Sequence, residues 1–542
     1  MAIIWNFIVP GRMFGILIFC LYAIAHSAAA EQESKRIRLI VTSDLHGWMS
    51  TALLYPTEKR KGLLHLAKSI KKARSKDPDL ILVDAGDLLQ GSPLVSYIHQ
   101  THKFPAAKDP FFKLFNSLGY DAVVVGNHDL GINPIFEREY LPNSEFSWLA
   151  ANIYRNTQLV FEPFTTLYRN GLKIVVLGFS TPGSQMWLGV DRLNGIEIRS
   201  VERSAAFWLK IIKRTEKPDL IIGVFHAGMY SIRDDENSKL NRISAANSVM
   251  ETLKKNDGFD LVIAGHDHRL SPGFKSKRIK YVRQTPIIEG GRWGEAFVFL
   301  DLRLLRSGNK WRIIDIEHKT HQASQSRKIE SSYLRLLPDD YKNYLQTPLP
   351  YLVTHTDKRR ASACLNRLNA MSQDGPTIMG TMLPKLSLSR LSGLNGKRVR
   401  RLDLYKWFRH DNRTVTVLLS MRDIQLLSQP VPEFGRRRIP YNRVLFSHFT
   451  SNVTVPEQPL WWLNGDEFIK KYPVKIADYH YYGGGGIKSQ IFLSSNQKVN
   501  ISKRVMRDQF FDFMQQRGPD LPESCEFLRY TGLKPNKKIL SR

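Results

Sequence analysis

The sequence predicts an α/β domain over residues 31–325 and a smaller α+β domain over residues 347–542. Three observations support this division. The 542 residues exceed what a single hydrophobic core usually organises. Apolar strand-like runs alternate with amphipathic segments in the first part of the chain. The composition, 42% hydrophobic and 11% aromatic, is that of a folded protein.

Six apolar runs of the first domain each end abruptly in polar residues, and we expect each run to form a strand. They lie in residues 37–47, 79–87, 120–129, 171–180, 218–228 and 259–268. A helical pattern over residues 62–75 follows the first run, and residues 295–319 are typical of a closing hairpin. In α/β folds ligands bind beyond the carboxyl ends of the strands, where these polar clusters lie.

The second domain follows a charged segment, residues 326–346, that we expect to be a linker helix. Beyond it, "RTVTVLLS" (413–420) and "YPVKIAD" (472–478) are expected strands, and a run of glycines covers residues 483–486. Strands mixed with turns favour an α+β fold for this part of the chain.

The N-terminus resembles a secretory signal peptide. Arg12 precedes an apolar run, and small residues end at Ala30, after which we expect cleavage. An uncleaved anchor is the alternative, because the first ten residues are also apolar. We expect a periplasmic or secreted protein with no membrane span after cleavage. Cys364 and Cys525 would remain, and an oxidising compartment would permit, without requiring, a disulfide between them.

The formal net charge is +29, nearly all of it outside the signal segment. A basic balance either attracts anionic partners, such as nucleotides, nucleic acid or membrane surfaces, or is spread over a solvated surface. The basic clusters at residues 397–401 and 435–438 lack the interleaved aromatic residues of a single-strand nucleic-acid groove. We therefore predict no specific nucleic-acid partner, and we expect a monomer.

Oxygen and imidazole donors gather at five of the strand ends. They are Asp44, His46, Asp87, Asn127, His128, His226, His266 and His268. No cysteine is among them, so the set suits Zn, Mn, Fe or Co rather than a thiolate site. The donors are too many for one tetrahedral ion. With one carboxylate shared, they would serve two ions about 3.5–4 Å apart.

Such a pair of ions would have a definite chemistry. Two bridged cations make a shared water acidic enough to be hydroxide near neutral pH, and they bind phosphate oxygens. A nearby histidine can protonate the leaving alkoxide. Taken singly the motifs are weak: a lone histidine after an apolar run, such as His226, is more often a core residue than a ligand. The prediction rests on five clusters ending five strands.

The motifs "SDLHG", "DAGDLLQGSP", "GNHD", "FHAG" and "AGHDH" resemble those of the calcineurin-like metallophosphoesterases. "LLQGSPL", "LAANIY" and "GGRWGEAF" are similar to the exported 5′-nucleotidase and 2′,3′-cyclic-nucleotide 2′-phosphodiesterase/3′-nucleotidase branch. In the second domain, "LDLYKWFRHDNRTVTVLLS" and "YPVKIADYHYYGGGG" resemble its nucleoside-binding segments. The resemblance implies an α/β sandwich of two β-sheets flanked by helices, with an α+β nucleoside-binding domain.

Site roles also follow from this resemblance. Asp44, His46 and His268 would bind one metal, Asn127, His226 and His266 the other, and Asp87 would bridge them. His128 would be the catalytic histidine. Tyr479 would stack on the base, with Phe446 or Phe449 as a second aromatic residue, although both fit a hydrophobic core equally well. Arg390, Arg398 and Arg401 are candidates for gripping phosphate.

The chain departs from the family pattern at two places. Gly131 stands where 5′-nucleotidases carry an Asp that orients the catalytic histidine, so that partner is missing or comes from elsewhere. The glycine run at residues 483–486 lacks the Asp that usually touches the nucleoside. Asp129 adjoins His128, but neighbours on an extended chain usually point apart. Both departures favour the cyclic-phosphodiesterase/3′-nucleotidase type.

We therefore expect an exported two-metal phosphohydrolase that acts on 2′,3′-cyclic nucleotides and 3′-nucleotides through a metal-bridging hydroxide. The alternatives are a 5′-nucleotidase or nucleotide-sugar diphosphatase, a thiosulfate-type hydrolase, and a basic surface-binding protein with a decayed catalytic site. The presence of every expected metal donor weighs against a decayed site.

Overall fold

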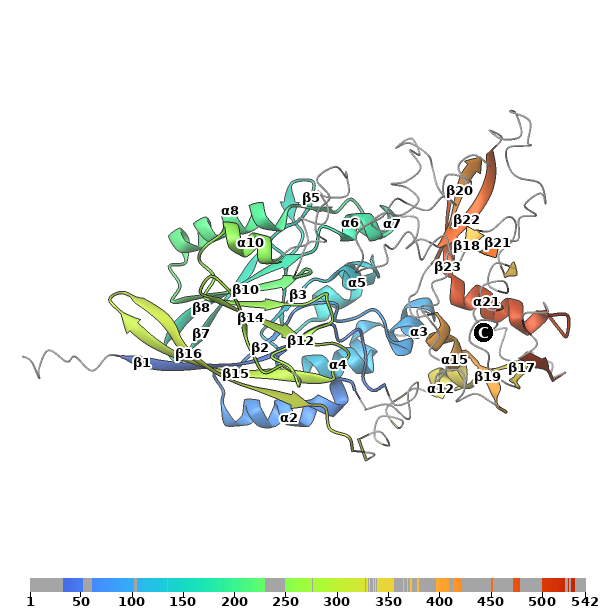
Figure 1. Ribbon diagram of the computed structural model, residues 1–542, viewed down its shortest axis with the longest axis horizontal. Coiled ribbons are helices and arrows are strands. Elements are labelled where there is room, and N and C mark those ends of the chain that lie inside the picture. Colours follow the sequence, from blue (N-terminus) through green and yellow to red (C-terminus); the bar gives the residue numbers. More distant parts are fainter. Residues whose placement is uncertain are drawn as a thin grey trace, which may run out of the picture.

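The structure is a computed structural model (Figure 1). It describes residues 33–326 except for 52–60, 102–104, 134, 189, 230–248 and 275. Further along the chain it describes residues 339–354, 396–408, 413–420, 471–477, 500–521 and 528–531, with a few shorter pieces between them. The expected signal peptide lies outside the described residues.

A six-stranded sheet forms one half of the first domain. Its order is β16(Lys310–Gln322), β15(Ala296–Ser307), β1(Ser34–Thr42), β2(Ile81–Asp84), β3(Ala122–Val124) and β4(Ser147–Leu149). Strands β1 to β4 are parallel, and the hairpin of β15 and β16 adds antiparallel to the edge at β1. The hairpin predicted from residues 295–319 is confirmed.

A second sheet faces the first. Its order is β12(Leu270–Ser271), β14(Thr285–Gly290), β11(Leu261–Ala264), β10(Leu220–His226), β8(Leu172–Ser180) and β7(Phe164–Arg169), and β13(Lys280–Val282) pairs with β14. Strands β8, β10, β11 and β14 are parallel. The six predicted strand segments thus divide equally, with β1, β2 and β3 in the first sheet and β8, β10 and β11 in the second.

Alternation along the strands builds three hydrophobic layers. Leu39 and Val41 point into the layer between the sheets, where they join Ile222 and Val224. Ile40 faces the opposite side, where helices cover the sheet. Because strand side chains alternate in direction, every one of these buried strands needs apolar residues on both faces. This requirement explains the unbroken apolar runs in the sequence.

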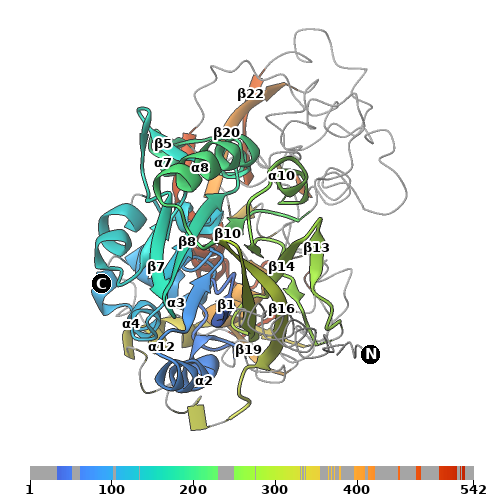
Figure 2. The ribbon, with the colours of Figure 1, turned by 90° about the vertical axis from the view of Figure 1, so that its left-hand side faces the viewer.

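Helices cover the outer face of each sheet (Figures 1 and 2). Helices α2(Leu63–Lys76), α3(Pro93–Thr101) and α4(Pro110–Asn116) pack on the first sheet, and α8(Val201–Thr215) and α10(Val249–Lys255) on the second. The predicted helix over residues 62–75 and the predicted sandwich of two sheets flanked by helices are confirmed.

Shorter elements complete the first domain. They are η1(Ala106–Lys108), α5(Asn127–Leu130), η2(Phe136–Tyr140), η3(Leu141–Asn143), α6(Ser184–Trp187), α7(Val190–Leu193) and the small sheet of β5(Ile153–Arg155), β6(Gln158–Leu159) and β9(Glu197–Ile198). None of the helices in the described residues is long and apolar enough to cross a membrane.

Helix α12(Asp339–Gln346) joins the first domain to the second. Its Tyr341 and Tyr344 rings lie 5.3 and 4.8 Å from the ring of Tyr97 on α3. Helix α12 occupies the C-terminal part of the segment, residues 326–346, that was predicted to be a linker helix. The domain limits at residues 325 and 347 stay a prediction.

The described residues of the second domain form three small sheets. They are formed by β19(Arg398–Arg400), β17(Pro348–Val353) and β24(Leu528–Tyr530); by β22(Lys471–Ala477), β20(Arg413–Ser420) and β23(Asn500–Val505); and by β18(Ile378–Met379) and β21(Thr450–Ser451). Helices α15(Arg401–Trp407) and α21(Met506–Gln516) pack beside the first of these sheets. The strands expected at 413–420 and 472–478 correspond to β20 and β22.

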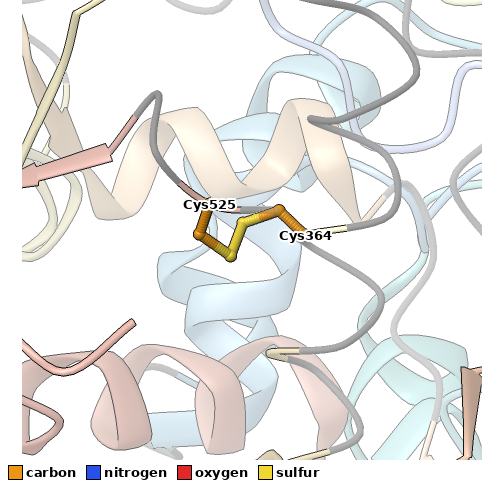
Figure 3. The surroundings of a disulfide bond; sticks show 2 residues. All are labelled: Cys364 and Cys525. Atoms are coloured by element: carbon orange, nitrogen blue, oxygen red, sulfur yellow. A yellow bond between two sulfur atoms is a disulfide. The ribbon is translucent and has the colours of Figure 1, made fainter. Parts of the chain in front are cut away.

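Cys364 and Cys525 form a disulfide in this domain, with Cα atoms 4.9 Å apart (Figure 3). Both residues are fully buried in the second domain's hydrophobic cluster. The structure thus joins the pair that the sequence left open.

Candidate metal centre

Five strand ends meet at one edge of the sandwich. The polar residues follow β1, β2 and β3 of the first sheet and β10 and β11 of the second. Because all five strands are parallel within their sheets, their carboxyl ends lie on the same side. The structure therefore brings together all eight donors that the sequence placed at strand ends.

The backbone turns sharply at most of these donors. Asp44, His46 and Asp87 have φ angles of 52°, 50° and 54°, and His266 and His268 have 76° and 56°. Non-glycine residues seldom adopt this left-handed conformation, which costs about 1–3 kcal/mol each and gathers at functional sites. His266 and His268 are separated by one residue, and left-handed turns direct both toward the donor clusters.

Long-range hydrogen bonds hold these turns. The backbone N–H of Asp44 donates to the carbonyl of Gly86 at 2.9 Å, and that of His46 donates to the carbonyl of Asp87 at 2.8 Å. The loops after β1 and β2 therefore fix each other, and the strain is offset by bonds between segments distant in sequence.

The first cluster consists of Asp44, His46 and His268. The Nε2 atoms of the two histidines are 3.0 Å apart, and Nε2 of His268 is 3.4 Å from Oδ1 of Asp44. Ligand atoms bound about 2.1 Å from a divalent cation lie roughly 3.0–3.5 Å from one another. The three side chains therefore fit a single metal ion.

The second cluster consists of Asp87, His226 and His266, with Asn127 beside them. Nε2 of His226 lies 3.3 Å from Oδ2 of Asp87 and 3.1 Å from Oδ1 of Asn127. The same Oδ2 of Asp87 is 3.8 Å from Nε2 of His46 in the first cluster. Asp87 thus lies between the clusters, where a shared carboxylate is needed.

Backbone carbonyls orient two of the imidazoles. Nδ1 of His226 lies 2.8 Å from the carbonyl of Ala85, and Nδ1 of His46 lies 2.6 Å from that of Gln90. A carbonyl only accepts, so each Nδ1 donates its hydrogen and each Nε2 presents a lone pair to the cluster. This arrangement is typical of metal-binding histidines.

The electrostatics of the cluster favour cations. Burial lowers the pKa of His46, His266 and His268, that of His266 to about 4, so these rings are neutral and able to bind metal. Burial would raise the pKa of Asp87, but the imidazoles of His226 and His128 outweigh it and hold the pKa well below its ordinary value. Three neutral imidazoles and an ionised Asp87 suit divalent cations, whereas His226, whose pKa rises to about 10 beside Asp87, must lose its proton before it can bind one.

His128 and Asp129 have different environments. His128 lies half-buried beside His46, with ring centroids 4.8 Å apart, and its backbone N–H donates to Oδ1 of Asp87 at 2.7 Å. Asp129 is fully buried, and its carboxylate accepts from the backbone N–H groups of Gly126, Leu88 and Leu89. Asp129 therefore ties the loop after β2 to α5, and it does not orient His128.

Some of the predicted substrate residues lie in the described part of the chain and others do not. Tyr479, Phe446 and Phe449 lie outside the described residues, as does Arg390. Arg401 is described: its guanidinium lies 2.7 Å from Asp508 and stacks 3.6 Å above the ring of Phe511. The side chain of Arg401 is therefore largely buried and paired within the second domain. This arrangement does not leave its guanidinium available to bind phosphate.

Residues 37–270 match the model of the calcineurin-like phosphoesterase family. The chain is 25% identical over 308 residues to a 2′,3′-cyclic-nucleotide 2′-phosphodiesterase/3′-nucleotidase of Yersinia enterocolitica, covering 53% of this chain and 46% of the relative. It is 26% identical over 290 residues to Protein UshA of Escherichia coli, covering half of each. The chain thus spans about half the length of these curated relatives.

A solved structure with the same fold is a putative 5′-nucleotidase from Staphylococcus aureus. Its TM-score is 0.67 at 15% sequence identity, over 92% of this chain and 98% of the other. At that identity the likeness concerns the fold alone. It extends across both domains.

Proposed function

We propose that the chain is a two-metal phosphohydrolase that acts on 2′,3′-cyclic nucleotides and 3′-nucleotides. The observation that carries this proposal is the pair of donor clusters that share Asp87, with His128 beside them. Asp44, His46 and His268 would hold one divalent ion, and Asn127, His226 and His266 the other. When bound, the ions would supply Lewis acidity and a water acidic enough to attack phosphorus near neutral pH.

The protein groups have separate tasks. Asp87 shares its carboxylate between the clusters, and its Oδ1 fixes the backbone of His128. His128 holds a proton for the leaving oxygen of the ribose. In the cyclic substrate the oxygen of water bonds to phosphorus, the bond to the 2′ oxygen breaks, and that oxygen takes the proton. A second hydrolysis breaks the 3′ ester and releases nucleoside and phosphate.

The substrate preference rests on Gly131 and on the activity for which the Yersinia relative is named. A 5′-nucleotidase or nucleotide-sugar diphosphatase is the second candidate, because the same two donor clusters around Asp87 would serve that reaction as well. The two are separated by assaying metal-loaded protein on 2′,3′-cyclic AMP, 3′-AMP, 5′-AMP and a UDP-sugar. Faster hydrolysis of 5′-AMP or of the UDP-sugar would refute the first proposal in favour of the second.

A different experiment tests the alternative of a basic binding protein with a decayed catalytic site. Asp87→Asn should abolish turnover on every phosphoester, because an amide cannot bridge two ions with negative charge. Asp260→Asn makes the same change at a carboxylate of the second sheet that accepts from the backbone of Ile221. That control should retain both metals and activity. Turnover retained in Asp87→Asn would rule out this site as the catalyst.

We further propose export to an oxidising compartment. The N-terminal segment and the buried disulfide between Cys364 and Cys525 support it. Cell fractionation, combined with mass spectrometry of the mature N-terminus, tests it. Protein found in the cytosol with both thiols free would contradict export.

A further inference from the structure

Gln90 touches two histidines of the site with two different atoms. Its backbone carbonyl lies 2.6 Å from Nδ1 of His46, and its side-chain Oε1 lies 3.3 Å from Nδ1 of His128. In the described part of the chain, His128 is the polar partner of the Gln90 side chain. One residue therefore contacts both a candidate metal ligand and the candidate catalytic imidazole.

The side chain of Gln90 occupies the space beside Gly131. A Cβ placed on Gly131 would lie 2.5 Å from Oε1 of Gln90 and 3.1 Å from the carbonyl of His128. The backbone of Gly131 has φ −61° and ψ −17°, a conformation open to any residue. Glycine is therefore not needed at position 131 for its flexibility. The space that a side chain would fill there is already taken by the carboxamide of Gln90.

We propose that Gln90 is the positioning residue of His128, an inference that rests on the proposed phosphohydrolase function. Oε1 of Gln90 accepts the Nδ1 hydrogen of His128 and fixes the ring plane. In the imidazolium form both ring nitrogens carry a hydrogen, and the Nε2–H then faces the leaving oxygen and gives it the proton. Gln90 and Gly131 depend on each other: the Gln90 amide contacts His128, and the absence of a side chain at Gly131 leaves space for that amide.

The pairing has a specific chemical consequence. Proton donation matters most when the leaving oxygen is a poor leaving group, such as the hydroxyl oxygen of a ribose. It matters little for a nitrophenolate, which leaves without a proton. Substitution of Gln90 should therefore slow nucleotide hydrolysis far more than hydrolysis of bis(p-nitrophenyl) phosphate. A defect transmitted through His46 and the metal site would slow both reactions alike.

The experiment uses the metal-loaded full chain, with kcat measured on bis(p-nitrophenyl) phosphate and on whichever nucleotide it hydrolyses fastest. For Gln90→Ala we expect two ions per chain and kcat on the nucleotide lower by roughly 10- to 100-fold, as when other partners that orient functional histidines are removed. Gln90→Glu keeps an acceptor oxygen and should retain most of the activity. Gln158→Ala, on exposed strand β6, is the control and should match the wild type.

Two double variants test the pairing directly. Gly131→Asp alone should lower kcat, because its side chain collides with Gln90. In the Gln90→Ala background the same change should raise kcat, because a carboxylate then fits beside His128. Adding Gln90→Ala to His128→Ala should not lower kcat further, since Gln90 acts through His128.

The failures are distinguishable. Wild-type protein inactive on all phosphoesters would refute the proposed function itself. An active wild type with unchanged kcat in Gln90→Ala would overturn the positioning role alone. Equal losses on both substrates, or loss of a metal ion, would also overturn it by showing that Gln90 acts through the His46 loop.

Discussion

Gly126 should not tolerate any side chain, because it lies too close to the Asp87 carboxylate that the two donor clusters share. Its φ of −92° and ψ of 170° suit any residue, so Gly126→Ala strains no backbone angle. A Cβ at this position would nevertheless lie 2.1 Å from Oδ1 of Asp87 and 2.3 Å from its backbone nitrogen. The substitution is therefore a purely steric push on Asp87 and on the loop that carries it.

The size of the push follows from the contact distances. Cβ contacts under 3.0 Å essentially never occur, so Oδ1 must retreat by at least about 0.9 Å in a close-packed interior. Metal sites tolerate about 0.2 Å in ligand distance. The retreat also lengthens the 2.7 Å bond from His128 N–H to Oδ1. Overpacking of this kind costs about 1–3 kcal/mol of stability.

The assay counts metal ions per chain by mass spectrometry after loading, together with kcat and thermal unfolding. We expect Gly126→Ala to bind fewer than two ions and to lose turnover while it still folds. Gly308→Ala is the matched control: it lies in the β15–β16 turn with φ 60° and no atom within 4 Å of the added Cβ. It should lose about 1–2 kcal/mol from the left-handed strain alone and keep both ions. Full metal content and wild-type kcat in Gly126→Ala would refute the reasoning.

Three further outcomes are expected. Asp87 beside His226 overcomes the effect of burial and raises the histidine pKa to about 10 in the metal-free protein. Because a metal ion must displace that proton, the affinity for metal should rise with pH, and activity should fall below about pH 6. Metal uptake near neutral pH should release protons, which calorimetry in two buffers can detect. A metal affinity that does not depend on pH would contradict this. Asp129→Ala should lower the free energy of unfolding by about 2–4 kcal/mol, as three buried N–H groups lose their acceptor, and Asp129→Asn by less; equal denaturation midpoints would contradict it. Replacing Cys364 and Cys525 by Ser should cost about 2–5 kcal/mol in the second domain with metal content unchanged, as urea unfolding can show; an unchanged profile would mean that the disulfide adds no stability.

Much of the first domain was predictable because its strands are apolar on both faces. Such runs stand out in the sequence, and their polar endings marked every donor of the site. The division of the strands between two sheets was not derivable from the runs themselves, since β3 and β8 have the same pattern. The family resemblance implied that there are two sheets, and the structure assigned each strand to one of them.

The direction of individual side chains was the part that local patterns could not supply. Asp129 follows His128 directly, yet it points to backbone N–H groups of another loop. Gln90 lies within the "LLQGSPL" motif, but nothing in that motif indicates a contact with His128. Its contact with His128 spans 38 positions. The empty position at Gly131 was the available clue that such a partner was needed.

The sequence by itself determined the kinds of donor and the points along the chain where they occur. It thereby set the class of metal that the site can hold. The tertiary structure decided which donors meet: His46 and His268 stand 222 positions apart and lie 3.0 Å from each other. The physical reason is that side-chain direction depends on φ, and the left-handed turns here are held by bonds between distant loops. No local pattern specifies those bonds.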